Sequence, residues 1–277
     1  MTSYVHGYSE REQERLHDQA GTLNELLHHD TRYPAGAQVL EAGCGVGAQT
    51  VLLAANSPEA QFTCLDISET SLIQARALAA SRGLTNVRFL CGDLYSLPFV
   101  ENNPQEWAGF NHVFLCFVLE HVAQPEMLLA SLSGVLKDGG TLTAIEGDHG
   151  SCFFHPETRA ARAAWQCLID AQAGLGGDSL VGRRLFPLLD GSGLAAVQVT
   201  RRDVYCDASR PQWMDGFVKK TIIPMVEGVK QTALAQGMID ESTWAQGIRD
   251  LHLTGKAPGG TFCYTFFKGV GTKQGST

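Results

Sequence analysis

Between residues 38 and 145, short apolar runs alternate with helical patterns, and this alternation constrains the fold more than any other feature. The runs predict strands at 38–43, 61–66, 87–91, 112–117 and 141–145, with helices between them at 48–55, 68–81 and 125–136. Strands that alternate with helices in this way form a parallel sheet covered by helices on both faces. We therefore expect an α/β, doubly wound, mostly parallel sheet that binds ligands at the carboxyl ends of its strands.

The rest of the chain adds two strands and several helices. Strands predicted at 195–205 and 261–270 bring the sheet to seven, and helical patterns cover 1–30, 158–173, 184–189 and most of 208–254. Large apolar residues in these helices either line a pocket or form ordinary core, and their spacing leaves both open: Trp165, Trp213, Phe217, Met225 and Trp244.

A glycine-rich loop joins the first predicted strand to the first helix. It reads Glu41-Ala42-Gly43-Cys44-Gly45-Val46-Gly47. Glycines let the backbone turn sharply and approach a ligand closely, and the following helix offers unpaired N–H groups. Taken alone, the loop is also consistent with a tight turn that binds nothing. Asp66, however, ends the second strand, where an acidic side chain hydrogen-bonds ribose hydroxyls.

Two more segments complete an ordered set of motifs. Gly92-Asp93-Leu94 follows the third strand, and Phe117-Val118-Leu119-Glu120-His121-Val122 follows the fourth. Together with the loop and Asp66, they resemble the class I S-adenosylmethionine-dependent methyltransferases of the small-molecule type, whose first motif is E/D-x-G-x-G-x-G. The resemblance covers about residues 36–147. It implies S-adenosyl-L-methionine as cofactor and S-adenosyl-L-homocysteine as product.

The resemblance also implies roles for individual residues at the cofactor. Glu41 would act at the methionine ammonium group or a water beside it, and Asp66 would bind the ribose hydroxyls. Ile67 would pack on the adenine, Asp93 would face its amino group, and Phe117 would lie near the sulfonium and the acceptor. The expected cofactor-binding set is Glu41, Gly43, Cys44, Gly45, Gly47, Asp66, Ile67, Gly92, Asp93, Leu94 and Phe117. Two members of this set, Ile67 and Leu94, have ordinary core as their alternative.

Polar side chains after the fifth predicted strand are candidates for the acceptor site. The segment reads Glu146-Gly147-Asp148-His149-Gly150. If the acceptor is a hydroxyl or ammonium group, a base must remove a proton, and His149 is a candidate base. Asp148 or Glu146 would bind a cationic acceptor, while a solvated turn is the alternative. His121 is a further catalytic candidate, or it only helps to cap the next segment.

Comparison with similar small-molecule methyltransferases divides the chain into a core and added helical parts. Residues 1–33 would form an N-terminal lid, with Tyr8, Arg11 and Gln19 as candidates to contact the methionine end or the acceptor. Residues 34–150 would bind the cofactor. Residues 151–180 and 207–255 would form helical cap insertions, and 181–206 and 256–277 would supply the remaining core strands. A cap of this size favours a small, enclosed acceptor.

Charge, apolar runs and cysteine spacing limit the classes of partner that we expect for this protein. The net charge is −8 without a basic stripe, so we expect no nucleic-acid substrate. No run approaches the roughly 18 apolar residues that span a bilayer, and the N-terminus lacks the pattern of a secretory signal, so we expect a cytoplasmic protein with no membrane partner. The eight cysteines include no C-x-x-C pair, which predicts reduced thiols and no metal site.

The expected function is therefore methyl transfer to an oxygen, nitrogen, sulfur or carbon atom of a small, polar metabolite. Three alternatives stay open. A nicotinamide dehydrogenase uses G-x-G-x-x-G, and Ala48 at the last position of that pattern is tolerated. A methyltransferase acting on protein or RNA shares the cofactor motifs. A non-catalytic scaffold would keep the fold without the reaction. Neither the acceptor nor the oligomeric state follows from the sequence.

Overall fold

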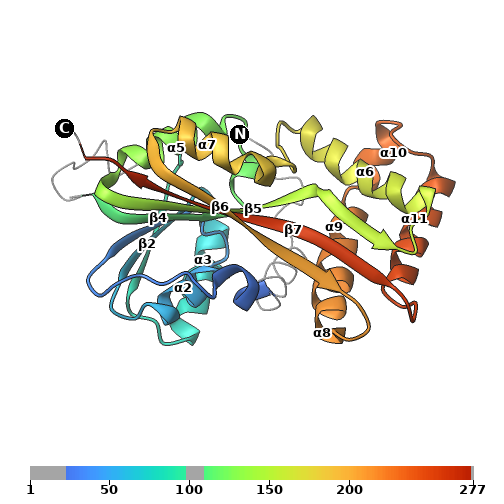
Figure 1. Ribbon diagram of the computed structural model, residues 1–277, viewed down its shortest axis with the longest axis horizontal. Helices are drawn as coiled ribbons and strands as arrows, with labels where there is room; N and C mark the ends of the chain where they lie inside the picture. The colour runs from blue at the N-terminus through green and yellow to red at the C-terminus, as the bar shows by residue number, and fades with distance from the viewer. Residues whose placement is uncertain (1–22, 98–108, 276–277) are drawn as a thin grey trace.

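The predicted seven-stranded sheet is confirmed. The structure, a computed structural model, describes residues 23–97 and 109–275. The strands are β1 (Gln38–Ala42), β2 (Gln61–Asp66), β3 (Val87–Cys91), β4 (Phe110–Cys116), β5 (Leu136–His155), β6 (Leu194–Cys206) and β7 (Thr261–Lys273). They lie in the order β3-β2-β1-β4-β5-β7-β6, with β1 to β5 parallel and β7 antiparallel to both of its neighbours. Figure 1 shows the sheet running through the length of the molecule.

Helices cover both faces of the parallel part, as a doubly wound sheet requires. Helices α2 (Thr50–Asn56) and α3 (Glu69–Ser81) lie on one side, and α5 (Pro125–Gly134) and α7 (Leu185–Gly191) on the other (Figure 1). Strand residues alternate between the two cores: Val39 packs in the core that includes Leu53 of α2, and Leu40 in the core that includes Leu128 of α5. A parallel strand buried on both faces reads as a continuous apolar run, which is why these strands were visible in the sequence.

Strand β5 is much longer than its sequence predicted. We expected the strand to end at Ile145, but β5 continues through the polar segment to His155, which also excludes the alternative of a solvated turn. Its second part pairs with β7, with Asp148 opposite Thr265 and Phe153 opposite Cys263, and the register shifts between them. The predicted strand end was wrong because glycines and charged residues interrupt the apolar pattern, while the partner strand that pairs their backbone lies more than 100 residues away.

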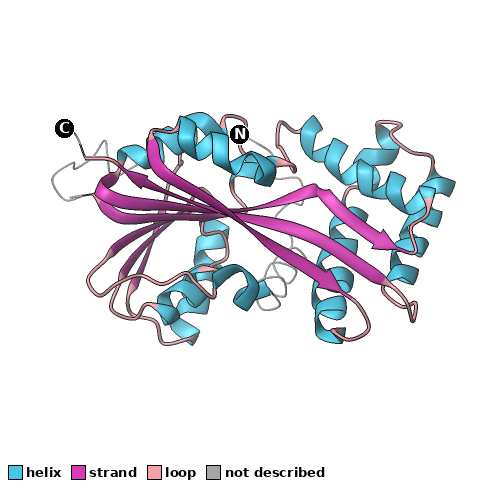
Figure 2. Cartoon of the chain, in the orientation of Figure 1, coloured by secondary structure: helices cyan, strands magenta, loops and turns pink. Residues whose placement is uncertain are grey.

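The ends of β5, β6 and β7 project beyond the parallel part and carry their own helices (Figure 2). We call this part, residues 149–180 and 204–264, the helical half. Its helices are α6 (Arg159–Gly174), α8 (Pro211–Trp213), the π-helical η3 (Met214–Ile222), α9 (Ile223–Gly228), α10 (Lys230–Ala235) and α11 (Glu241–Thr254); two short 3-10 helices, η1 (Leu119–His121) and η2 (Val181–Arg184), lie near its junction with the rest.

Aromatic side chains fill the interior of the helical half. The rings of Phe217 and Phe262 are 5.9 Å apart, and those of Trp165 and Phe262 are 6.2 Å apart. Trp165, Phe217, Met225 and Trp244 are all buried in one hydrophobic core, and Trp213 is partly buried and packs against it. These residues therefore form ordinary core, which decides between the two possibilities that their spacing left open. Within the described residues, no helix has both the length and the apolar character needed to cross a bilayer.

Candidate functional site

The glycine loop after β1 leaves one stretch of backbone open to a ligand. Gly43, Gly45 and Gly47 all have positive φ, at 74°, 53° and 81°. A Cβ on Gly43 would lie 2.7 Å from Val118 Cγ2, and one on Gly47 would lie 3.0 Å from Ala75 Cα of α3, so both glycines permit close internal packing. A Cβ on Gly45 would meet nothing within 4 Å. Gly45 therefore presents bare backbone to open space, as contact with a ligand requires.

Asp66, at the end of β2, is held against this loop. Its Oδ2 accepts the N–H of Gly45 at 2.8 Å, and its Oδ1 accepts the N–H of Ser68 at 2.9 Å. Burial raises the pKa of the Asp66 carboxyl, and the two backbone donors oppose that shift. Each carboxylate oxygen accepts more than one hydrogen bond, so the fixed carboxylate keeps acceptor capacity for hydroxyl groups.

Beside Asp66 lies an apolar side chain that is largely exposed. Ile67 is 62% exposed, so it is not part of the core, whereas Leu94 packs against the core on the α5 side. Asp93 is exposed, and its Oδ1 accepts the N–H of Tyr95 at 2.9 Å. Gly92 donates its N–H to the carbonyl of Asp66 at 3.0 Å, which joins the ends of β2 and β3. The ends of β2 and β3 thus expose one apolar side chain, Ile67, and one acidic side chain, Asp93. An apolar surface beside a hydrogen-bond acceptor suits a purine ring.

Glu41 lies beneath the loop rather than on its surface. It is 2% exposed, and its Oε2 accepts the hydroxyl of Thr50 at 2.6 Å. Burial raises the pKa of the Glu41 carboxyl to about 7. Cys44 is buried as well, and burial raises the pKa of its thiol. An effect of Glu41 on a methionine ammonium group would therefore pass through an intervening group, such as the water that the resemblance allows.

The turn after β4 carries the predicted residue at the reacting centre. Phe117 has φ of 59°, which is unusual for a residue with a bulky side chain, and its N–H donates to the carbonyl of Ile145 at 2.9 Å. Its ring lies 5.4 Å from that of Phe266 on β7. In η1, which follows, His121 Nε2 lies 3.4 Å from Glu120 Oε1. This turn places an aromatic ring and a histidine at the carboxyl end of β4.

The three predicted acceptor residues of β5 are engaged in internal contacts. None of Glu146, Asp148 and His149 is more than 3% exposed. Asp148 forms a two-bonded ion pair with Arg183, with both N–O distances at 2.8 Å. His149 Nδ1 shares a hydrogen bond of 2.8 Å with the hydroxyl of Tyr264. Burial, followed by the nearby Glu120, raises the pKa of Glu146 well above its usual value.

Arg183 and Tyr264 are the contacts that sequence reasoning missed. Arg183 lies in η2, after Gly182, where a Cβ would come within 2.6 Å of the Gly147 carbonyl oxygen. A Cβ on Gly147 would in turn lie 2.3 Å from the Tyr264 hydroxyl. The glycines around Asp148 therefore allow close packing of distant segments. No local sequence pattern predicts such packing, since Gly147 lies far in the sequence from both Gly182 and Tyr264.

The remaining predicted residues lie elsewhere. Tyr8, Arg11 and Gln19 fall outside the described residues.

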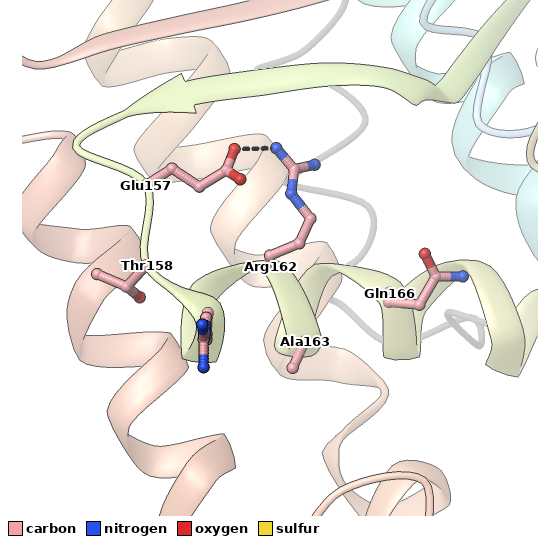
Figure 3. Close-up of a pocket in the computed structure, with 6 residues that line it drawn as sticks. Glu157, Thr158, Arg162, Ala163 and Gln166 are labelled. Carbon is pink, nitrogen blue, oxygen red and sulfur yellow. Dashed lines mark hydrogen bonds and ion pairs between the residues drawn. The ribbon is translucent and has the colours of Figure 1, made fainter.

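All eight cysteines are free thiols, and within the described ranges no three His, Cys, Asp or Glu side chains are grouped to hold a metal ion. A surface hollow at the start of α6 includes Glu157, Thr158 and Arg162, with Glu157 paired to Arg162 (Figure 3). This hollow contains none of the predicted site residues.

Comparisons with known proteins agree with the geometry of the loop and the strand ends. Residues 39–140 match a family model described as a methyltransferase domain. Demethylmenaquinone methyltransferase of Listeria monocytogenes is 32% identical over 116 residues, which are 42% of this chain and 46% of that protein. The chain thus matches about half the length of this curated relative.

Two further similarities extend beyond the matched domain. An uncharacterized 37.1 kDa protein in a transposon of Streptomyces fradiae is 29% identical over 208 residues, covering 74% of this chain and 57% of that protein. The structure of Haemonchus contortus phosphoethanolamine N-methyltransferase 2, with phosphomonomethylethanolamine and S-adenosylhomocysteine, aligns with a TM-score of 0.54. It covers 93% of this chain and 53% of that one at 13% identity, which is a likeness of fold.

Proposed function

Since residues 39–140 form a methyltransferase domain of the class I S-adenosylmethionine-dependent family, we propose that the chain transfers a methyl group from S-adenosyl-L-methionine to a small, polar metabolite. The observation that carries this proposal is the open backbone at Gly45, fixed by Asp66 and flanked by the exposed Ile67. We also propose that it acts in the cytoplasm, on a substrate that is not a nucleic acid. The net charge of −8 supports the second point.

The cofactor fits the residues present. Gly45 leaves room for close approach, Asp66 offers acceptors for the ribose hydroxyls, and the exposed Ile67 offers an apolar surface for the adenine. Asp93 supplies a carboxylate at the neighbouring strand end. When bound, S-adenosylmethionine supplies an electrophilic methyl group on a sulfonium. The protein's part is then to orient the two reactants, because alignment of reacting groups provides much of the rate.

The acceptor would lie at the carboxyl end of β4, near Phe117 and the neighbouring Ile145 of β5. A hydroxyl or ammonium acceptor needs a base, and we propose His121 ahead of His149 for this role. The side chain of His121 is 22% exposed, whereas His149 is 3% exposed and bonded to Tyr264. Asp148 is committed to Arg183, which supports a structural role for this carboxylate over binding of a cationic acceptor.

Labelling of a cell extract tests the proposal. The extract is separated into small molecules, protein and RNA, and each fraction is incubated with the protein and S-adenosylmethionine carrying a tritiated methyl group. We expect label in the small-molecule fraction, and much less label there when Asp66→Ala replaces the wild type at a low cofactor concentration. Label in the protein or RNA fraction would show that the acceptor is a macromolecule and would contradict the proposed small metabolite. Cofactor binding without label in any fraction would favour a non-catalytic scaffold.

A further inference from the structure

One buried carboxylate holds the backbone of the turn after β4. Glu146 is 0% exposed, and its Oε1 accepts the N–H of Val118 at 2.9 Å and the N–H of Leu119 at 2.8 Å. The preceding N–H, that of Phe117, donates to the carbonyl of Ile145 at 2.9 Å. Three consecutive N–H groups of this turn are therefore anchored to two adjacent residues of β5.

The anchored turn contains a strained residue. Phe117 has φ of 59°, and a left-handed conformation is energetically unfavourable for a residue with a side chain. Such a conformation persists only where surrounding contacts hold it. The hydrogen bonds from residues 117–119 to β5 are contacts of this kind, because they fix the peptide groups on the C-terminal side of Phe117 as well as its own N–H.

The same turn also contacts the glycine loop and β7. Val118 Cγ2 lies 2.7 Å from the position that a Cβ on Gly43 would occupy, so a side chain at that position would displace the turn. The Phe117 ring lies 5.4 Å from the Phe266 ring. A shift of residues 117–119 would therefore move Phe117 relative to the loop that receives the cofactor.

We propose that Glu146 is a positioning residue for methyl transfer, acting through Oε1 to hold the turn at residues 117–119, so that Val118 stays against Gly43 and Phe117 stays against Phe266. The proposal rests on the proposed function. It gives Glu146 a role through backbone groups, in place of the direct contact with a cationic acceptor that its position after the predicted strand suggested. Oε2 has no hydrogen-bond partner in the part of the chain that the structure describes, so replacing it with an amide nitrogen breaks no hydrogen bond of that atom.

The test uses S-adenosylmethionine labelled with carbon-13 in its methyl group, and needs no acceptor. A phenyl ring held beside the methyl shifts its NMR resonance, and the shift is lost if the ring moves. We expect Glu146→Ala to lose at least half of the wild-type difference between bound and free resonances, while its Kd changes less than threefold. Glu146→Gln keeps an acceptor for both N–H groups and should retain the wild-type resonance.

A double mutant separates positioning from general damage. Phe117→Gly accepts a positive φ and removes the ring, so it should lose the shift, and adding Glu146→Ala should change nothing further. If Glu146→Ala does not fold, Glu146→Asp replaces it, because the shorter side chain withdraws the carboxylate from both donors. A wild-type resonance in bound Glu146→Ala or Glu146→Asp overturns the proposal. Failure of the wild type to bind S-adenosylmethionine would instead overturn the proposed function.

Discussion

Two regions of the molecule use polar side chains in opposite ways. At the ends of β2 and β3, Asp66 is only half-buried, Asp93 is exposed, and Ile67 is 62% exposed. At the junction with the helical half, Asp148 and His149 are buried and bonded to Arg183 and Tyr264. The first region keeps binding groups available to a ligand, whereas the second uses similar residue types to fix its own backbone. A polar residue at the ligand end of a strand is thus no sufficient sign of ligand contact.

Near the ends of β2 and β3, Glu41 is an exception because its carboxyl is buried. We expect it to cause the largest of the effects predicted here, a fall in the free energy of unfolding as pH rises. Burial raises the pKa of its carboxyl from 4.5 to about 7. Between these pH values the folded protein holds a proton that the unfolded chain has released, so stability falls as pH rises. One pKa unit corresponds to about 1.4 kcal/mol, so the loss is about 3 kcal/mol.

Chemical denaturation of the wild type and Glu41→Gln from pH 4.5 to 8 measures this effect. The amide does not titrate, so the free energy of unfolding of the wild type should fall relative to the variant over this range. As a control, Glu69→Gln removes an exposed carboxyl whose pKa is lowered by Arg76, and should show no such fall. A pH-independent difference between the wild type and Glu41→Gln would contradict the account.

Removing the partner of Asp148 tests whether this carboxylate is structural. Arg183→Met leaves the buried Asp148 carboxylate with one hydrogen-bond donor among the described residues, the N–H of Gly150. A buried charge that loses its partner destabilises a protein by 3–5 kcal/mol, and since Arg183 is 49% exposed we expect about 2 kcal/mol here. Urea denaturation measures the loss, and the affinity for S-adenosylmethionine should stay within threefold.

Arg184→Met is the matched control, because Arg184 pairs with Asp178 and Glu126 near the surface. Exposed pairs contribute up to about 1 kcal/mol. Equal stability of Arg183→Met and the wild type would show that Asp148 does not depend on Arg183. The carboxylate would then be available to an acceptor, and the contrast between the two regions would fail.

Ile67→Ala gives the smallest expected effect. If an adenine ring covers this side chain, the truncation removes roughly 0.5–1 kcal/mol of apolar contact and raises the Kd for S-adenosylmethionine about two- to fivefold. Ile73→Ala is the control, because Ile73 is 60% exposed on α3 and should leave the Kd unchanged. Isothermal calorimetry resolves the difference. Equal affinities of the two variants for S-adenosylmethionine would contradict packing of the adenine on Ile67.

The geometry of the strand ends after β1 and β2 was largely predictable from the sequence, and that of the segment after Ile145 was not. Gly45 and Asp66 lie in short segments that directly follow or end a predicted strand, so their positions could be predicted from local sequence. The strand order places β1 and β2 side by side and so brings the two residues together. The course of β5 beyond Ile145 depends on pairing with β7 more than 100 residues later, so a window of local sequence shows only glycines and charges. The turn that contains the left-handed Phe117 likewise bonds to Glu146 through the N–H groups of Val118 and Leu119, across 28 and 27 positions in the chain.

Calorimetric titration of S-adenosylmethionine into the wild type, Asp66→Ala and Asp66→Asn tests the central claim most directly. Asp215→Ala serves as a control for the loss of an exposed carboxylate far from the loop. We predict micromolar binding to the wild type and the control, and at least tenfold weaker binding to Asp66→Ala, because a charged hydrogen-bond acceptor is lost. Asp66→Asn should fall between them. No binding to folded wild type, or equal binding by Asp66→Ala, would contradict a cofactor site built on Gly45 and Asp66.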